Sequence, residues 1–291
     1  MKYIAGLGEA LWDVLPSGRQ IGGAPANFAY HAGQFGRPAY AVSAVGNDDL
    51  GNELLARFAE KNLYTLIPQI DFPTGTVDVS LTGDGIPLYD IRQGVAWDNI
   101  PTTAALLALA NDTIAVCFGS LAQRSDVSRQ TIYRFLDAMP DDSRVLKIFD
   151  INLRQHYYNR EVITASLERC NVLKLNEDEL PILVDMLGIG GTDAVTQGRG
   201  LMQAFDLRLV ILTQGAHGSY VLSATDTSFI ETPKVEVADT VGAGDAFTGA
   251  FVGSLLQGKT PREAHLTAVR ISAYVCTQHG AMPEIPDYLK Q

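Results

Sequence analysis

The sequence predicts an α/β fold in which helices cover both faces of a mostly parallel sheet, with a small lid of β-strands. Short apolar runs rich in β-branched residues alternate with helical patterns along most of the 291 residues. This alternation is typical of a parallel sheet buried on both faces. The stretch from Leu66 to Ile100 breaks the rhythm with a hairpin-like pattern. No internal repeat or long linker divides the chain, so we expect a single domain over residues 1–291.

The apolar pattern places the main elements in order. We expect the first strand from Lys2 to Gly8. Further buried strands are expected at Tyr40–Val45, Thr113–Phe118, Val145–Ile151, Asn171–Leu175 and Leu209–Thr213. Apolar residues at helical spacing predict helices at Pro25–Phe35, Leu50–Lys61, Val127–Met139 and Asp193–Phe205. In such sheets the ligand usually binds beyond the carboxyl ends of the strands, so we expect the functional residues there.

The lid is expected from residues 66–100 together with residues 12–22. Thr76 to Thr82 alternates polar and apolar residues, and Gly83-Asp84-Gly85 predicts a turn. Leu88 to Ile91 then predicts the returning strand. A flap of this kind commonly covers a ligand.

Charge restricts the partners that we expect. With 22 basic and 33 acidic residues the formal net charge is -11, and no run of Lys and Arg occurs. Nucleic acids and anionic membranes favour a basic surface, so neither is an expected partner. The apolar strand face of Val77, Val79 and Leu81 is compatible with a homodimer through the lid, and equally with a lid folded onto its own body.

The N-terminal pattern, the apolar runs and the cysteines predict a cytoplasmic protein. The chain opens on a strand pattern instead of a charged and then apolar signal. No apolar run approaches the roughly 18 residues that a membrane helix needs. Cys117, Cys170 and Cys276 are far apart and odd in number, so we expect reduced thiols.

One motif imitates a phosphate-binding loop. Gly253 to Thr260 satisfies the pattern G-x-x-x-x-G-K-[ST], but it follows residues at helical spacing, whereas a P-loop lies between a strand and a helix. Gly258 is expected to end that helix, and Thr260 to Glu263 resembles the capping box of the next one. We therefore reject the P-loop interpretation and assign Lys259 no role.

Two glycine pairs begin a dinucleotide-binding fingerprint. They are Gly6-Leu7-Gly8 and Gly242-Ala243-Gly244. Leu11 and Phe247 stand where the third glycine should be, which disfavours a nicotinamide oxidoreductase.

The strongest chemical signal is the run from Asp239 to Phe247, Asp-Thr-Val-Gly-Ala-Gly-Asp-Ala-Phe. A strand-like stretch from Lys234 to Val237 leads into it, and a helix is expected to begin near Ala243. Free N–H groups in the first turn of a helix form an anion site that suits a phosphoryl group. Asp245 lies in that turn, within reach of a bound group. A purely structural role, in which Asp245 stabilises the helix dipole, is equally compatible with this position.

These residues resemble the signatures of the PfkB/ribokinase family of sugar kinases. Asp239 to Asp245 is similar to the family's D-T-x-G-A-G-D, and Gly22 to Asn27 is similar to its G-G-x-x-x-N. Further similar segments occur in the family's order: Gly46-Asn47-Asp48, Asp150 to Arg154, Asn176 with Glu179, Thr213 with Gly215 and Gly218, and Gly280-Ala281 with Pro283. The resemblance covers nearly the whole chain and implies a ribokinase-like fold.

The resemblance implies roles on the nucleotide side. Asp245 would accept the proton of the attacking hydroxyl, and the N–H groups of Gly242, Ala243 and Gly244 would stabilise the moving phosphoryl group. Asn176 and Glu179 would help to hold Mg²⁺ and the phosphates of ATP through water, although the same pair also fits a helix cap. Thr213, Gly215 and Gly218 would line the nucleotide site, although they could also form a simple turn. Asp239 and the Val241 carbonyl would bind a monovalent cation such as K⁺, although Asp239 could instead cap the loop.

On the sugar side, Asp13 follows the first strand, where its carboxylate could accept hydrogen bonds from two hydroxyls. Gly23 would permit close approach, and Asn27 could contact another hydroxyl. Arg154 is the cation expected near the substrate or phosphate. Asp13 could instead be a turn residue, and Asn27 a buried capping amide.

The expected reaction is ATP plus sugar to ADP plus sugar phosphate. Trp12 to Pro16, Gly23 to Ala29 and Ala96-Trp97-Asp98 most resemble bacterial fructokinases, which implies D-fructose as substrate and fructose 6-phosphate as product. A 2-keto-3-deoxygluconate kinase stays open because Arg92 and Arg154 could bind a carboxylate. A ribokinase, a different kinase of this family, and a non-catalytic sugar or nucleotide sensor also stay open.

Overall fold

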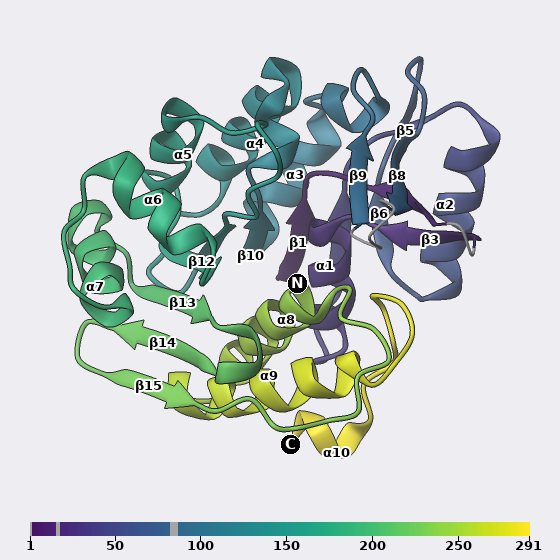
Figure 1. Ribbon diagram of the computed structural model, residues 1–291. Coiled ribbons are helices and arrows are strands. Elements are labelled where there is room, and N and C mark those ends of the chain that lie inside the picture. Colours follow the sequence, from purple (N-terminus) through teal and green to yellow (C-terminus); the bar gives the residue numbers. More distant parts are fainter. Residues whose placement is uncertain (1, 16–17, 82–86) are drawn as a thin grey trace.

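The computed structural model describes residues 2–15, 18–81 and 87–291. Its main sheet has nine strands in the order β15-β14-β13-β12-β11-β10-β1-β4-β6 among these residues (Figure 1). The strands are β1 (Tyr3–Leu7), β4 (Ala39–Val42), β6 (Tyr64–Leu66), β10 (Thr113–Phe118), β11 (Leu146–Asp150), β12 (Val172–Asn176), β13 (Leu209–Thr213), β14 (Ser219–Ser223) and β15 (Thr227–Ile230). From β6 to β13 all neighbours are parallel, whereas β14 and β15 pair antiparallel. The mostly parallel sheet predicted from the sequence is therefore confirmed.

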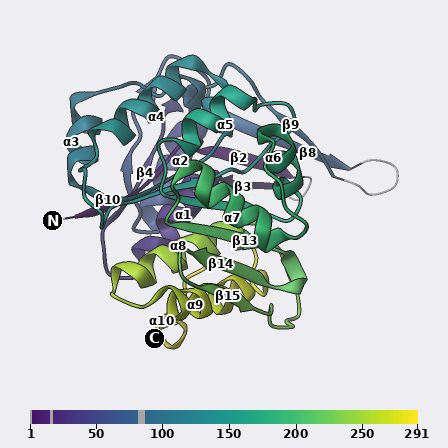
Figure 2. The same ribbon diagram turned by 90° about the vertical axis from the view of Figure 1, so that its left-hand side faces the viewer.

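Helices cover both faces of the main sheet (Figures 1 and 2). One face carries α3 (Ala104–Asp112), α4 (Asp126–Ala138), α5 (Arg160–Leu167), α6 (Glu179–Leu187) and α7 (Ala194–Phe205). The other carries α1 (Ala24–Gly33), α2 (Asp49–Glu60), α8 (Ala243–Leu256) and α9 (Pro261–Cys276). The short helix α10 (Asp287–Lys290) packs on α9.

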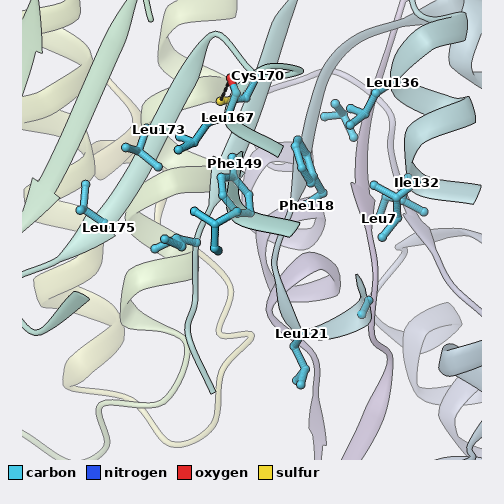
Figure 3. Packing of buried hydrophobic residues seen from close by; sticks show 14 of the residues in the cluster. Leu7, Phe118, Leu121, Ile132, Leu136, Phe149, Leu167, Cys170, Leu173 and Leu175 are labelled. Carbon is cyan, nitrogen blue, oxygen red and sulfur yellow. Dashed lines mark hydrogen bonds between the residues drawn. The ribbon is translucent and has the colours of Figure 1, made fainter. Parts of the chain in front are cut away.

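The two cores follow from the alternation of side chains along each strand. On β10, Val116 and Phe118 pack with α3 to α7, whereas Ala115 and Cys117 face the other helices. Phe118 stacks on Phe149 of the neighbouring strand β11, with ring centroids 5.2 Å apart (Figure 3). Because both faces are buried, these strands appear in the sequence as short, continuous apolar runs.

A second sheet lies over one edge of the body. Its strand order is β3-β2-β8-β9, with β2 (Leu11–Leu15), β3 (Gly18–Gly22), β8 (Gly75–Leu81) and β9 (Pro87–Ile91). Two short strands, β5 (Val45–Gly46) and β7 (Gln69–Ile70), pair with each other in a separate sheet. Val77 of β8 is buried in the body's core, whereas the side chains of Val79 and Leu81 and the expected turn at 83–85 lie outside the described residues.

The second sheet is joined to the body by buried polar contacts. Asp48 caps α2 by accepting from the Gly51 N–H at 2.7 Å, and it also accepts from the N–H and hydroxyl of Thr74, which precedes β8. After β9, Asp98 pairs with Arg124 at 2.8 Å, and the Arg124 guanidinium lies 4.0 Å from the Trp97 ring. Trp97 and Asp98 are both buried, so the Ala96-Trp97-Asp98 segment anchors this sheet.

Most local predictions are confirmed, and one is wrong. Gly253 lies inside α8, Gly258 follows its C-terminus, and Thr260 forms a capping box with Glu263 at the start of α9, so this segment is not a P-loop. The stretch Lys234 to Val237 is irregular instead of a strand, and Val235 and Val237 are exposed there. Alternating valines suggested a strand, but this segment has no neighbouring strand to pair with among the described residues. Within the same residues no helix is both long and apolar enough to cross a membrane.

Candidate active site

A cavity of about 820 Å³ lies at the carboxyl ends of the main-sheet strands, under the second sheet. The residues predicted from the sequence that line it are Asp13, Gly23, Asn27, Arg154, Asn176, Thr213, Val241, Gly242, Gly244 and Asp245. Other predicted residues, namely Glu179, Gly215, Gly218, Asp239 and Ala243, lie outside its lining. Glu9 and Lys174 also line it, and sequence reasoning missed both.

The turn at the start of α8, where the sequence predicts an anion site, depends on a glycine. Gly242 is the N-cap residue with a φ of 76°, and an added Cβ would lie 2.7 Å from the Cβ of Ala281. Only glycine fits this turn without strain, and the turn places the first N–H groups of α8 at the cavity. The Ala243 N–H donates to the Thr240 carbonyl at 3.3 Å. Of the three residues Gly242, Ala243 and Gly244, the two glycines line the cavity.

Asp245 is held by a residue from a distant part of the chain. Asn27 on α1 donates from Nδ2 to Oδ2 of Asp245 at 2.8 Å. Asn27 is 4% exposed, and its Oδ1 has no hydrogen-bond partner within the part of the chain that the structure describes. Burial raises the pKa of Asp245, whereas the Asn27 hydrogen bond and the cations Lys174 and Arg154 lower it. Asn27 therefore orients this carboxylate and favours its charged form.

Lys174 supplies a buried cation next to the start of α8. Its side chain leaves the middle of β12, and Nζ lies 3.1 Å from Oδ1 of Asp150. A Cβ added to Gly244 would lie 3.3 Å from the same Nζ. Burial alone would lower the pKa of Lys174, but the carboxylates of Asp150, Glu179 and Asp245 raise it overall, so the side chain stays charged. A charged residue inside the apolar strand Val172–Asn176 was the sequence signal that could have revealed it.

Two further acids, Asp13 and Glu9, line the cavity. Asp13 on β2 is partly buried, and desolvation raises its pKa to about 6 although Arg154 opposes the shift. Glu9, between β1 and β2, is 3% exposed, and desolvation raises its pKa to about 7. Gly23 packs against Glu9, since its φ is 113° and an added Cβ would lie 2.4 Å from the Glu9 carbonyl oxygen.

Arg154 reaches the cavity from a loop with an unusual backbone. Asn152 and Gln155, after β11, have φ values of 44° and 48°, in the left-handed region that non-glycine residues adopt infrequently. The Arg154 side chain is exposed, and Nη1 donates to the Leu153 carbonyl at 3.0 Å. Arg92, the other cation considered for a substrate carboxylate, is exposed and does not line the cavity.

Asn176 and Glu179 are engaged in local hydrogen bonds. Oδ1 of Asn176 accepts from the N–H groups of Asp178 and Glu179, each at 2.9 Å. The Glu179 carboxylate is buried and accepts from the N–H groups of Asn176 and Leu153, also at 2.9 Å. The pair therefore forms the helix cap that its spacing allows. Each carboxylate oxygen keeps a second lone pair, which is compatible with a water-mediated contact to a metal.

The remaining residues that the sequence analysis expected at a nucleotide site and a cation site shape two loops. Thr213 ends β13 at the cavity, and Gly215 and Gly218 follow in the turn to β14, both at positive φ. Asp239 accepts from the N–H groups of Val241 at 3.0 Å and Gly280 at 3.1 Å, so it joins this loop to the C-terminal segment.

The donor set tests the fit to a metal. Among residues 2–15, 18–81 and 87–291 no group of three His, Cys, Asp or Glu side chains could hold an ion. Mg²⁺ suits such a site when phosphate oxygens and water supply most of its ligands. The Glu179 carboxylate, whose two oxygens each accept one N–H group, fits a contact to such an ion through water.

The chain matches known proteins over most of its length. The model of the pfkB family of carbohydrate kinases matches residues 17–287. An ATP-dependent 6-phosphofructokinase of Thermoanaerobacterium thermosaccharolyticum is 31% identical over 277 residues, covering 92% of this chain and 83% of that protein. A fructokinase of Klebsiella pneumoniae is 28% identical over 305 residues, covering 96% and 95%.

Solved structures share the fold. The fructokinase of Vibrio cholerae, with fructose, ADP and calcium bound, superposes with a TM-score of 0.79 at 23% identity, covering 97% of this chain and 95% of that one. An Escherichia coli structure in complex with ATP and Mg²⁺ has a TM-score of 0.83 at 21% identity, covering 97% and 94%.

Proposed function

Because the chain belongs to the pfkB family of carbohydrate kinases, we propose that it transfers the γ-phosphate of ATP to D-fructose and forms fructose 6-phosphate. Membership of the family makes it a phosphotransferase with a sugar hydroxyl as acceptor, built on the ribokinase-like fold. The nucleotide, the metal and the identity of the sugar belong to the proposal. The observation that carries it is the position of Asp245, held by Asn27 at the N-terminus of α8 inside the cavity.

Asp245 is the proposed general base. It accepts the proton of the sugar hydroxyl as the hydroxyl oxygen bonds to the γ-phosphorus of ATP. The bond from that phosphorus to the oxygen that bridges it to the β-phosphate breaks, and ADP leaves with the electron pair. Because such transfers rely on positioning and charge stabilisation, the orientation imposed by Asn27 is central.

The start of α8 and Lys174 are the proposed stabilisers of negative charge on the transferred group. Gly242 and Gly244 present backbone at the helix N-terminus, where the dipole favours an anion, and Ala243 completes the turn. The Lys174 ammonium lies beside Gly244 and contributes a fixed positive charge. Donors held rigidly in a partly dry site stabilise a transition state more than solvated ones do.

The nucleotide is proposed to bind on the side of Asn176 and Thr213, with Gly215 and Gly218 shaping its loop. Glu179 would hold Mg²⁺ through water, and the metal would neutralise charge on the phosphates. Asp239 and the Val241 carbonyl are proposed for a monovalent cation such as K⁺. The complex of a structural relative with ATP and Mg²⁺ supports the nucleotide and the metal.

An uncharged sugar is the proposed acceptor. Glu9 provides a buried carboxyl group and Asp13 a partly buried one, and carboxylates bind hydroxyls well but repel phosphate. Relatives named fructokinase at 28% and 26% identity support fructose. The 31% identity to a 6-phosphofructokinase favours a second candidate, fructose 6-phosphate, for which Arg154 is the available cation at the acceptor side. With Arg92 outside the cavity, a carboxylate-bearing sugar acid has the weaker case.

The test is ADP release with Mg-ATP against fructose, fructose 6-phosphate, ribose, glucose, tagatose, 2-keto-3-deoxygluconate and adenosine. Fast turnover on fructose alone is the expected outcome. Preference for fructose 6-phosphate would make the second candidate correct. Turnover on another sugar would correct the acceptor but keep the reaction, and no turnover on any of them would contradict the proposed function.

A further inference from the structure

Glu9 is a buried acid at the cavity whose role the reaction above leaves undefined. It follows β1 and Gly8 directly, at the carboxyl end of a central strand. Its residue is 3% exposed and it lines the cavity together with Asp13, Asn27 and Asp245. The chain therefore places an ionisable group at the ligand site.

One oxygen of this carboxyl group has no protein partner. Oε2 of Glu9 is buried and makes no hydrogen bond within residues 2–15, 18–81 and 87–291. The backbone N–H groups of Glu9 and Ala24 are close enough to the carboxyl to lower its pKa, so part of the group is satisfied by the chain itself. An unpaired buried oxygen is costly, and a ligand in the cavity is the natural source of the missing partner.

The charges around Glu9 restrict that partner. Arg154 lowers the pKa of Glu9 and Asp245 raises it, while desolvation is the largest cause and brings the pKa to about 7. Asp13 also lines this side of the cavity. A phosphate or carboxylate would be repelled by these acids. A hydroxyl suits Glu9, because it donates to the charged carboxylate, and a hydrogen bond to a charged acceptor is stronger than one to a neutral amide.

We propose that Glu9 binds the acceptor directly, with Oε2 hydrogen-bonded to a sugar hydroxyl other than the one that is phosphorylated. This inference rests on the proposed sugar-kinase function and adds a residue that recognises the acceptor sugar. Asp245 acts on the reacting hydroxyl, whereas Glu9 and Asp13 contact the rest of the sugar. Glu9 is thereby a determinant of acceptor specificity.

The test uses Glu9→Gln, which keeps the size of the side chain but replaces one carboxylate oxygen by an NH₂ group and removes the charge. We expect the KM and the calorimetric Kd for the acceptor to rise about 10- to 100-fold. The KM for ATP should change less than about twofold, since the proposed nucleotide side lies elsewhere. Glu60→Gln is the matched control, because Glu60 is an exposed carboxylate on α2 that pairs with Arg57 of the same helix outside the cavity, and it should leave all constants unchanged.

Monodeoxy sugars identify the contacted hydroxyl. One monodeoxy analogue of the acceptor should lose about as much affinity in the wild type as Glu9→Gln does, and should lose little more in the variant. A structural role for Glu9 would instead lower the melting temperature and leave acceptor binding intact. A role only through Asp245 would move the pH profile of kcat but not the acceptor Kd. Either result would overturn the inference.

The outcomes separate this inference from the proposed function. If the wild type phosphorylates fructose and Glu9→Gln does so with unchanged KM, the inference is wrong and the proposed function stands. If the wild type turns over nothing but binds fructose, and Glu9→Gln abolishes that binding, the inference stands without the kinase reaction. Absence of any acceptor binding to the wild type would contradict both. If Glu9→Gln does not fold, Glu9→Asp, which withdraws the carboxyl by one methylene, should show the same selective loss.

Discussion

Asn27 and Asp245 are 218 residues apart in sequence and are joined by a hydrogen bond of 2.8 Å between Nδ2 and Oδ2. The bond connects α1 to α8, which pack side by side on one face of the main sheet. The two glycine-containing motifs that precede these helices thus meet at one carboxylate. This contact orients Asp245 and opposes the rise in its pKa that burial causes, and both effects suit the general base that we propose.

The first prediction concerns Asp245 itself. Asp245→Ala should lower kcat about 10²- to 10⁴-fold, because the general-base contribution is lost. Sugar binding, measured by calorimetry, should be largely kept. A variant that retains most of its turnover would remove Asp245 from the mechanism.

The second prediction concerns Asn27. Its hydrogen bond lowers the pKa of Asp245, so Asn27→Ala should raise that pKa and move the acid limb of the kcat/KM profile to higher pH. At neutral pH kcat should fall about tenfold, because the base also loses its orientation. The pH dependence of kcat/KM for both proteins checks this, and an unmoved acid limb would contradict the proposed role.

The third prediction separates two effects of Lys174. Lys174→Met should cost about 3–5 kcal/mol of stability, because Asp150 would be left as a buried unpaired charge. The double variant Lys174→Met with Asp150→Asn should recover stability in denaturant titrations. Its kcat should stay low if Lys174 stabilises the transferred phosphoryl group. Full recovery of kcat would mean that Lys174 is only structural.

The fourth prediction concerns stability in acid. His265 is fully buried between Ser219 and Ser228, at 2.8 and 2.9 Å, and desolvation lowers its pKa to about 4. Below pH 6.5 the unfolded chain binds a proton at this residue and the folded protein does not, so stability rises with pH between about 4 and 6.5. Glu9 and Asp13, whose pKa values are raised, act in the opposite direction in overlapping windows.

The variant His265→Gln isolates this contribution. It should be less stable than the wild type at pH 7, and the difference in free energy of unfolding should shrink as the pH falls towards 4. Denaturant titrations at several pH values measure the difference. A difference that is constant with pH would show that His265 does not carry the effect.

The fifth prediction concerns the second sheet, which we propose closes over the sugar to exclude water. Since a wet site would hydrolyse ATP, phosphate release without sugar should be far slower than ADP release with sugar. Asp48→Ala removes the hydrogen bonds that tie Thr74 and α2 together, and it should raise the KM for the sugar. Equal ATPase activity with and without sugar would contradict closure.

Sequence alone determined what depends on neighbouring residues. The glycines around Asp245, the capping box at Thr260 and the apolar strands are all predicted correctly, because turns, caps and side-chain alternation are set within a few positions. The order of the motifs along the chain was enough to indicate the family, which the match over residues 17–287 confirms. The strand predicted at Lys234 to Val237 was wrong, because a strand needs a neighbouring strand to pair with as well as an alternating sequence.

Only the tertiary structure decided which side chains meet. Asn27 contacts Asp245 through the packing of two helices, and the Lys174 side chain extends from β12 to Gly244 at the start of α8. Glu9 lacked any motif of its own, and its importance comes from burial and an unpaired oxygen. Desolvation and charge pairing act through space, so the pKa values and partners of these groups cannot be read from their positions in the chain.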